Sequence, residues 1–322
     1  MLYPITFHPI FKERVWGGRE LERLYRKPLP PGVPIGESWE VSDRPGDVSV
    51  IANGPLAGKD LRWLMKHHAA ELLGGAAPPE GRFPLLIKIL DAQERLSLQV
   101  HPPPAKAAAL GGEPKTEMWF IAKAAPGAEL YVGLKRGVTR AEFESKIRSG
   151  AVAECFHRVA VHSGDAMFLP SGRVHALGAG LVIFEIQQNS DTTYRVFDWN
   201  RVGLDGKPRD LHVPQSLASI AFDDFEPSLL PTAWKANDAG KVRSLVRHSL
   251  FNVEAREVGA GASAALAPSR LQIIGLLEGQ AKLCGDGVTV DLAPGQFSLV
   301  PASLASVVVR AETRVAFLRV EA

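Results

Sequence analysis

The feature that most constrains this chain is the regular alternation of short strand-like segments with turns rich in glycine and proline. Its 30 glycines and 24 prolines are spread along all 322 residues instead of being gathered in one linker. Short strands at regular spacing with turn signals between them are typical of a β-sandwich or β-barrel. We expect strands over residues 83–90, 95–100, 117–123, 128–134, 165–170, 181–188 and 192–199.

Helical patterns are few. Residues 59–74 have apolar side chains at helical spacing, and residues 139–150 open with Thr139 followed three residues later by Glu142, which forms a capping box. A third helix is expected over residues 213–222. The strand pattern lapses near residues 227–245 and then resumes, so we place a boundary there. The prediction is a domain over residues 1–230 with helical additions and a smaller β domain over 240–322.

Two stretches of the chain share one turn frame. GDAMFLPSGRVH (residues 164–175) and GQFSLVPASLAS (residues 295–306) each have a glycine, five residues and a proline. The second copy has serines where the first has Gly172 and His175. Internal repeats determine architecture, so the chain is expected to contain two related β units. Only the first keeps a candidate metal ligand in this turn, although a frame this common also arises by coincidence.

Composition excludes several classes of partner. The net charge is +2 and no long basic run occurs, which gives no electrostatic footprint for nucleic acid or an acidic membrane. No apolar run reaches the ~20 residues of a membrane span, and the N-terminus has no signal-peptide pattern. Cys155 and Cys284 form no metal or disulfide motif. We therefore expect two reduced thiols and a cytoplasmic location.

Four residues of the first unit form a candidate metal site. Gln99 and His101 are two apart on a predicted strand and so point to one face, Glu117 begins the next strand, and His175 follows the turn. Such a mixed nitrogen and oxygen set suits a divalent ion such as Zn²⁺. Taken singly, each residue has an ordinary explanation. His101 before prolines is typical of a turn, Glu117 of a solvated carboxylate, and Gln99 can point into solvent.

The chain resembles type I mannose-6-phosphate isomerase in its short bacterial form. The resemblance lies in GESWEVSD (36–43), LLIKIL (85–90), LSLQVHP (96–102), KTEMWF (115–120), PSGRVHALG (170–178) and EIQQNSDTTYRVFDW (185–199). The turn motif also matches the second cupin motif through its histidine, with Ala179 where an asparagine is usual. The resemblance implies an all-β fold, a double cupin jelly roll with a few short helices. It also implies one divalent metal, usually zinc, and a sugar phosphate substrate.

The resemblance assigns the metal to Gln99, His101, Glu117 and His175. It implies an active-site arginine at Arg195, acidic residues near the sugar at Glu185 and Asp191, and a lysine at Lys115. Longer members have a histidine where this chain has Pro114, which leaves no required role for that histidine here.

Aldose–ketose isomerisation moves a proton between C1 and C2 through an enediol, which needs a base, charge stabilisation and a phosphate anchor. Glu185 on an apolar strand is the first choice of base and Asp191 the second. Lys88, inside another apolar strand, is expected to contact the substrate and help neutralise its phosphate, together with Ser97.

Other interpretations stay open. Glu185 and Lys88 can simply pair with each other, Asp191 can be a turn residue, and Arg195 and Lys115 can be solvated. Two other functions are a cupin oxygenase and a non-catalytic sugar-phosphate-binding cupin. The chain is expected to be a monomer or a homodimer.

Overall fold

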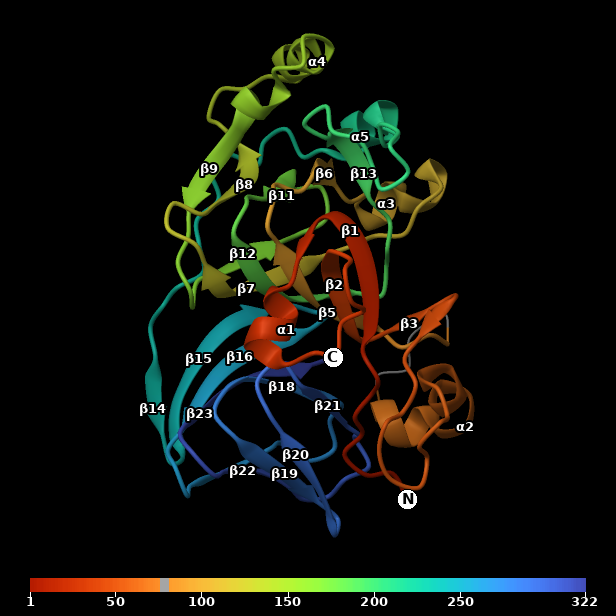
Figure 1. Cartoon of the computed structure of the whole chain (residues 1–322), viewed down its shortest axis with the longest axis vertical. Helices are drawn as coiled ribbons and strands as arrows, with labels where there is room; N and C mark the ends of the chain where they lie inside the picture. Colours follow the sequence, from red (N-terminus) through yellow and green to blue (C-terminus); the bar gives the residue numbers. More distant parts are fainter. Residues whose placement is uncertain (76–80) are drawn as a thin grey trace.

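Strands paired into antiparallel sheets are the main secondary structure of the molecule (Figure 1). The computed structural model describes residues 1–75 and 81–322. Four larger sheets are present in these residues, arranged as two pairs. The expected all-β architecture is therefore confirmed.

The first pair of sheets forms the upper half of the molecule in Figure 1. One sheet has the order β1 (Ile10–Gly18), β2 (Ile35–Val41), β5 (Leu85–Ala92), β12 (Leu181–Gln188), β7 (Glu117–Ala124), β10 (Ala166–Leu169). The other has the order β13 (Tyr194–Phe197), β6 (Leu98–Val100), β11 (His175–Leu177), β8 (Glu129–Leu134), β9 (Phe156–Ala160). A short ribbon joins β3 (Asp43–Arg44) and β4 (Asp47–Val48).

The second pair forms the lower half. One sheet has the order β14 (Lys235–Asn237), β15 (Gly240–Arg247), β16 (Asn252–Val258), β23 (Val315–Glu321), β18 (Gln272–Glu278), β21 (Phe297–Val300). The other has the order β17 (Ser263–Ala265), β22 (Val307–Ala311), β19 (Ala281–Gly285), β20 (Val288–Leu292). β14 lies where the strand pattern was expected to lapse. Its three residues are exposed, so no apolar alternation marks this strand in the sequence.

Five short α-helices lie in the connections between strands of the described residues. They are α1 (Glu20–Tyr25), α2 (Leu61–Leu73), α3 (Pro104–Ala107), α4 (Arg140–Arg148) and α5 (Val213–Ser219), with 3₁₀ turns at Ala108–Leu110 and Val152–Cys155. The side chain of Asp60 accepts a hydrogen bond from the Trp63 amide at the start of α2, and Thr139 accepts one from the Glu142 amide at the start of α4. These caps satisfy backbone donors that the first helical turn leaves free. The three predicted helices are therefore present, although α5 ends three residues early. Among the described residues, no helix combines the length and apolarity that crossing a bilayer requires.

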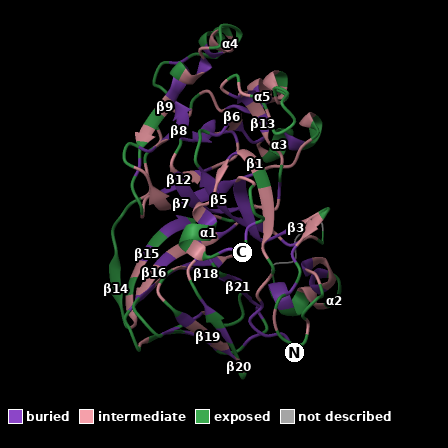
Figure 2. Cartoon of the chain, in the orientation of Figure 1, coloured by how far each residue is buried: buried purple, intermediate pink, exposed green. Residues whose placement is uncertain are grey.

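The burial pattern explains why β12 is apolar on both faces. Phe184 and its alternate neighbours pack in a core shared with the second pair of sheets, where the Phe184 and Phe297 ring centroids lie 5.5 Å apart. Ile183 belongs instead to the core inside the first pair. A separate core fills the second pair. The two pairs therefore pack back to back through a buried layer (Figure 2).

Both copies of the repeated turn carry the chain from one sheet to its partner. The first copy connects β10 to β11 and the second connects β21 to β22, and in each case the two strands belong to different sheets. The amide of the residue three positions after the proline bonds to the proline carbonyl in both copies, at 3.1 Å for Arg173 and 3.3 Å for Leu304. The tight turn before His175 is thus the place where the chain changes sheets.

Candidate active site

The inner face of the first sheet presents a row of directly opposed side chains. Lys88 on β5 pairs with Glu185 on β12, and Glu185 pairs with Trp119 on β7. Because side chains alternate along a strand, Gln187 and Glu117 form the next row of the same face. Polar residues on three separate strands therefore converge inside the first pair of sheets.

The facing sheet presents a second row. His175 on β11 and Arg195 on β13 are both paired with Gln99 on β6. One strand was expected to carry both Gln99 and His101. In the structure β6 ends at Val100, so His101 is the first residue after the strand. The two rows place all four predicted metal ligands in one region.

Three of the predicted ligands form a buried cluster. His101, Glu117 and His175 are at most 1% exposed, and their candidate ligand atoms lie within 4.8 Å of one another. The Glu117 carboxylate lies 3.5 Å from Nε2 of His101 and 3.3 Å from Nε2 of His175. The amide nitrogen of Gln99 lies 3.4 Å from the same His175 atom. Because the amide oxygen and nitrogen exchange places on a 180° rotation, Gln99 can present its oxygen to this point.

Backbone carbonyls determine which ring nitrogens face the cluster. Nδ1 of His101 lies 2.7 Å from the Thr192 carbonyl, and Nδ1 of His175 lies 2.9 Å from the Arg173 carbonyl. A carbonyl oxygen only accepts, so each Nδ1 carries the proton and each Nε2 has a free lone pair. Metal-binding histidines are oriented in this way.

The residues present fit a bound cation. Nε2 of His101 and Oε1 of Glu117 are buried without a hydrogen-bond partner, and Oε2 of Glu117 has only an ion pair with Lys115 at 2.8 Å. Buried polar atoms without partners are costly unless another group satisfies them. Burial and the nearby Lys115 lower the pKa of His101 to about 4, and burial lowers the pKa of His175. Burial would raise the pKa of Glu117, but Lys115 and His101 hold it well below its usual range. Two neutral imidazoles and one carboxylate are the protonation states that a divalent metal requires.

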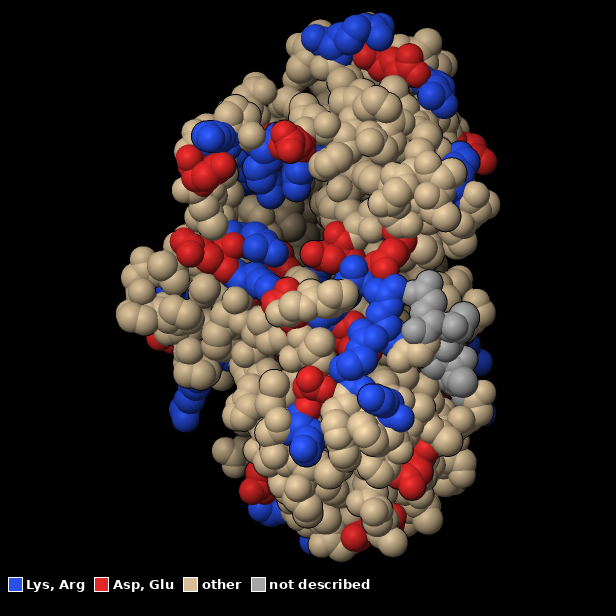
Figure 3. All heavy atoms as spheres, turned by 90° about the vertical axis from the view of Figure 1, so that its right-hand side faces the viewer, with Lys and Arg blue, Asp and Glu red and all other residues tan. Residues whose placement is uncertain are grey.

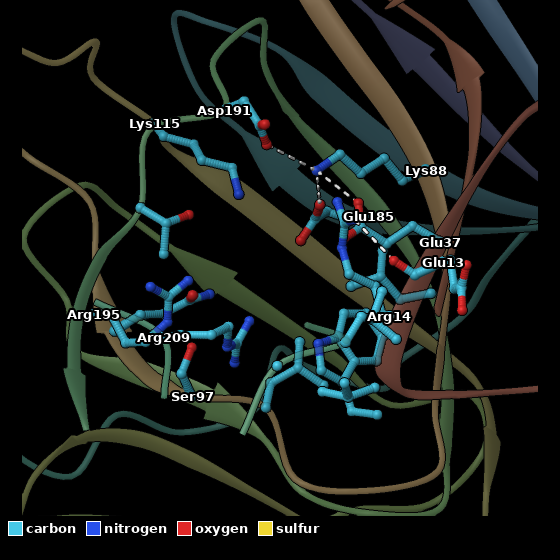
Figure 4. A pocket seen from close by; sticks show the side chains of 18 of the residues that line it. Glu13, Arg14, Glu37, Lys88, Ser97, Lys115, Glu185, Asp191, Arg195 and Arg209 are labelled. Atoms are coloured by element: carbon cyan, nitrogen blue, oxygen red, sulfur yellow. Dashed lines mark hydrogen bonds and ion pairs between the residues drawn. The ribbon is translucent and has the colours of Figure 1, made fainter. Parts of the chain in front are cut away.

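Gln99 also lines a cavity of about 550 Å³. Every predicted catalytic and substrate-binding residue lines the same cavity: Lys88, Ser97, Lys115, Glu185, Asp191 and Arg195. Figure 4 shows these side chains directed toward one space from several strands and loops. In the space-filling view, this half of the molecule is hollowed, and acidic and basic side chains gather around the hollow (Figure 3).

At one end of the cavity, Lys88 lies among three carboxylates. Its ammonium nitrogen is 3.4 Å from Glu185, 3.5 Å from Glu37 and 3.8 Å from Asp191. The pairing of Lys88 with Glu185 that the sequence left open is therefore present. The Trp119 indole N–H donates to one Glu185 oxygen at 2.9 Å, and the other oxygen is buried without a hydrogen bond.

Lys115 connects the cavity to the buried cluster. Its ammonium lies 2.8 Å from the Glu117 carboxylate, and the residue is 4% exposed. Burial alone would lower the pKa of Lys115, but Glu117, Glu185 and Asp191 raise it. Lys115 is thus a buried cation between the cluster and the carboxylates, and the solvated alternative is wrong.

The opposite end of the cavity is cationic. Arg195 donates one hydrogen bond to the Asp210 carbonyl at 2.8 Å, and its Nε is buried without a partner. Arg209 lines the cavity beside it (Figure 4). Burial and the charge of Arg209 lower the pKa of Arg195. This end therefore has unused capacity to bind an anion.

Comparison with known proteins identifies the family. Residues 5–117 match the model of the phosphomannose isomerase type I catalytic domain. The chain is 35% identical over 306 residues to the probable mannose-6-phosphate isomerase GmuF of Bacillus subtilis, covering 94% of each chain. The chain belongs to the mannose-6-phosphate isomerase family.

Solved structures of this family share the fold. The crystal structure of the mannose 6-phosphate isomerase from Bacillus subtilis superimposes with a TM-score of 0.90 at 30% identity and covers all of both chains. A putative mannosephosphate isomerase from Archaeoglobus fulgidus matches with a TM-score of 0.77 at 25% identity, over 99% of this chain and 98% of that one. The double cupin jelly roll expected from the family resemblance is confirmed.

Five charged residues that line the cavity were not predicted as site residues: Glu13, Arg14, Glu37, Asp205 and Arg209. Glu37 lies within GESWEVSD, where its spacing of two from Trp39 puts both side chains on one strand face. Glu37 accepts hydrogen bonds from Arg14 and from Trp39, each at 2.7 Å. Burial would raise the pKa of Glu37, but Lys88 and Arg14 lower it to about 2. Arg209 comes from a loop, and no periodicity in the sequence marks it.

Proposed function

We propose that this chain is a metal-dependent aldose–ketose isomerase that interconverts mannose 6-phosphate and fructose 6-phosphate. One observation carries the proposal: the buried cluster of His101, Glu117 and His175 adjoins, through Gln99, a cavity with carboxylates at one end and arginines at the other. A site of this kind suits a polyhydroxy anion whose reaction is a proton transfer.

His101, Glu117, His175 and Gln99 would hold the metal, which we propose to be Zn²⁺ because two imidazoles and a carboxylate suit that ion. When bound, it supplies positive charge beside the oxygen atoms on which the enediolate charge develops. Residues of the chain transfer the proton and bind the substrate.

Glu185 is our first choice for the group that moves the proton. It takes a proton from C2 of the aldose and returns one to C1, and the hydroxyl proton on O2 passes to O1, so that the oxygen on C1 becomes a hydroxyl and the oxygen on C2 becomes a carbonyl. Atoms and electrons balance without an added reactant. The Glu185 oxygen that accepts no hydrogen bond supports this role, because its ion-pair partner, the Lys88 ammonium, is 3.4 Å away and it can still accept a proton. Asp191 is the second choice, since its side chain is 52% exposed and so less shielded from water.

Lys115 and Lys88 supply positive charge at fixed positions. Lys115 is near enough to Glu185 and Asp191 to interact with both, so its ammonium can hydrogen-bond a sugar oxygen on which charge develops. Lys88 neutralises the neighbouring carboxylates, which keeps three acidic groups together in a small space. Ser97 and Arg195 are proposed to bind the far end of the substrate, where the phosphate lies.

The same proposal assigns different roles to two domains of the chain. Residues 1–230 would form the metal-binding catalytic domain, and residues 240–322 a smaller cupin-like domain without metal. The turn of the second unit ends at Ser306, which is exposed. Both cysteines are free thiols, which supports a cytoplasmic location. A monomer or a homodimer remains the expected assembly.

A coupled assay with mannose 6-phosphate tests the function. The purified chain is assayed as prepared, after treatment with a chelator, and after addition of Zn²⁺. Activity is expected to disappear with the chelator and to return with the ion. If the fully metal-loaded chain does not isomerise mannose 6-phosphate, the proposal is wrong. Sugar-phosphate binding without turnover would identify a binding protein, and oxygen uptake would identify an oxygenase.

A further inference from the structure

The segment that follows β13 forms one wall of the cavity at its cationic end. Gly203, Leu204, Asp205 and Arg209 of this segment line the cavity. It is a narrow loop in which Val202 bridges to Pro208, and the Gly203 amide donates to the Lys207 carbonyl at 2.7 Å. We call residues 199–211 the cavity loop.

One buried carboxylate anchors both arms of the cavity loop. Asp198 is 5% exposed and accepts hydrogen bonds from Arg201 at 2.9 and 3.1 Å. It also accepts two from Arg209, at 2.6 and 2.7 Å. Arg209 reaches both Asp198 oxygens through two N–H groups, which is the strong bidentate form of such a pair, whereas both Arg201 bonds end on Oδ1. Asp198 therefore fixes the direction in which Arg209 enters the cavity.

Further contacts join the loop to the segment before β6, which carries Ser97. The Trp199 indole donates to the Leu96 carbonyl at 2.7 Å, and Arg201 donates to the Arg95 carbonyl at 2.6 Å. Trp199 and Asn200 have left-handed backbones, with φ of 58° and 55°. Such conformations cost free energy and persist where the surroundings impose them.

Charge accounting points to an anion at this end. Asp198 carries one negative charge for the two guanidinium groups that it binds, and the other carboxylate near Arg201, that of Glu94, is 3.9 Å away and 68% exposed. Arg195 has no carboxylate among its hydrogen-bond partners in the described residues and keeps a buried N–H without a partner. The one acidic side chain that the loop contributes to the lining, Asp205, accepts a hydrogen bond from the Lys207 amide of its own loop at 3.0 Å. Arg195, which has no carboxylate partner among these residues, therefore lies beside Arg209. Arg209 shares the single Asp198 charge with Arg201, and such a pair of arginines is a site for a dianion.

We propose that Asp198 is a positioning residue that holds Arg209 beside Arg195, so that the two arginines together bind the phosphate group of the substrate. The inference rests on the proposed function for the identity of the substrate. It assigns to the cavity loop the selection of phosphorylated over unphosphorylated sugars, while proton transfer takes place at the Lys88 end.

The test compares Asp198→Asn and Arg209→Ala with the wild-type protein, all loaded with metal. Each variant is expected to raise the KM for mannose 6-phosphate and the inhibition constant of inorganic phosphate by about tenfold or more, the cost of a hydrogen-bonded charge. The kcat is expected to stay within about threefold, because the loss concerns binding. The matched control is Glu129→Gln, which breaks another two-point carboxylate–arginine pair, with Arg158, outside the cavity.

A double variant separates positioning from direct binding. If Asp198 acts through Arg209, adding Asp198→Asn to Arg209→Ala changes the KM by less than about twofold, because nothing is left to position. Full additivity of the two changes, or a loss of kcat with unchanged KM, would overturn the proposal. If Asp198→Asn fails to fold, Arg209→Ala still tests the phosphate anchor. The Arg209 side chain is 25% exposed, so its removal should leave the fold intact.

Binding of inorganic phosphate to the metal-loaded protein, measured by calorimetry, keeps the two proposals distinguishable. Weaker phosphate binding in both variants supports the anchor even if the wild-type protein does not isomerise mannose 6-phosphate. Unchanged phosphate binding in Arg209→Ala refutes the anchor and leaves the isomerase proposal intact.

Discussion

At the level of single residues, the protonation of the two buried histidines is determined by the backbone. Each Nδ1 donates to a carbonyl, so each Nε2 faces Glu117 with a lone pair. The arrangement leaves three buried polar atoms without a hydrogen-bond partner. A bound cation would satisfy all of them, and no hydrogen bond within the cluster does so.

Replacement of His175 tests the metal site directly. His175→Ala is expected to lose stoichiometric metal, because one nitrogen ligand of a small set disappears. The control is His162→Ala, whose side chain is 88% exposed and which should keep its metal. Metal content measured by atomic absorption decides. Equal metal in both variants would mean that the cluster is not the binding site.

The choice of base is tested at Glu185. Glu185→Gln is expected to lower kcat by about 10²–10⁴-fold, as for other proton-transfer groups, with zinc content unchanged because Glu185 is outside the cluster. Asp191→Asn is measured alongside it, with Arg195→Ala as a comparison. A normal kcat in Glu185→Gln with a loss in Asp191→Asn reassigns the base to Asp191. If both keep their activity, neither carboxylate is the base.

At the level of elements, the turn between β10 and β11 places His175. Gly172 has φ of +94°, its amide donates to the His101 carbonyl at 2.9 Å, and its carbonyl accepts from the Ala221 amide at 2.9 Å. The glycine thus joins the two histidine-bearing segments by a backbone contact. The second copy of the turn has Ser303 at this position and lacks the histidine.

Gly172→Ala is expected to reduce both stability and metal affinity. The left-handed backbone costs about 1–3 kcal/mol for a residue with a side chain, and the new Cβ would lie 3.3 Å from the Ser219 carbonyl oxygen. Gly137→Ala is the matched control, since Gly137 has φ of +89° with open space around it. Both variants should unfold at lower denaturant concentration. Only Gly172→Ala should also bind Zn²⁺ more weakly in a competition titration, by about tenfold or more. Equal metal affinity in the two variants would contradict this role.

At the level of the whole molecule, two barrels share one apolar layer, and the N-terminal segment crosses between them. Ile5 pairs with Leu299 of β21 through two backbone hydrogen bonds of 2.7 and 2.8 Å. Lys27 lies between the halves, with its ammonium 2.7 Å from Glu40 and 3.0 Å from the Gly295 carbonyl. Unfolding of the two halves is therefore expected to be coupled.

Acid unfolding tests the electrostatics of the cavity. The pKa of Glu37 is lowered to about 2, so its stabilisation is present above its ordinary value of 4.5 and is lost as the pH falls from 4.5 toward 2. The contribution is on the order of 3 kcal/mol. In Glu37→Gln, the unfolding free energy should therefore fall less steeply with decreasing pH in that window. The measurement is denaturant unfolding of metal-free protein, and the exposed Asp238→Asn serves as the control. An unchanged slope in Glu37→Gln would show that Glu37 is not held as a buried anion.

The sequence by itself determined the elements and much of the candidate site. Strand 181–188 was predicted to the residue, and the three helices were found, because periodicity and caps are local signals. Glu117 and His175 were placed because their motifs lie at the starts of strands, where short spacings dictate which face a side chain takes, whereas Lys88 and Glu185 lie within strands and meet through strand register. Strand 95–100 shortens to β6 because the pairing with β13 and β11, not the local propensity, decides its length.

Only the tertiary structure decided which side chains meet across the barrel. No spacing in the chain relates Lys88 to Glu37, or Asp198 to Arg209, because these contacts depend on strand register and on a loop that closes over the cavity. The shared face of Glu185 and Gln187 was expected to line the cavity, but the sequence could not show that the opposite face of β12 packs against the second barrel. Burial on two sides removes the alternation that marks a surface strand. The local sequence pattern thus determined the strands, the helices and the residue types of the metal site. Long-range packing determined which charged side chains surround that site.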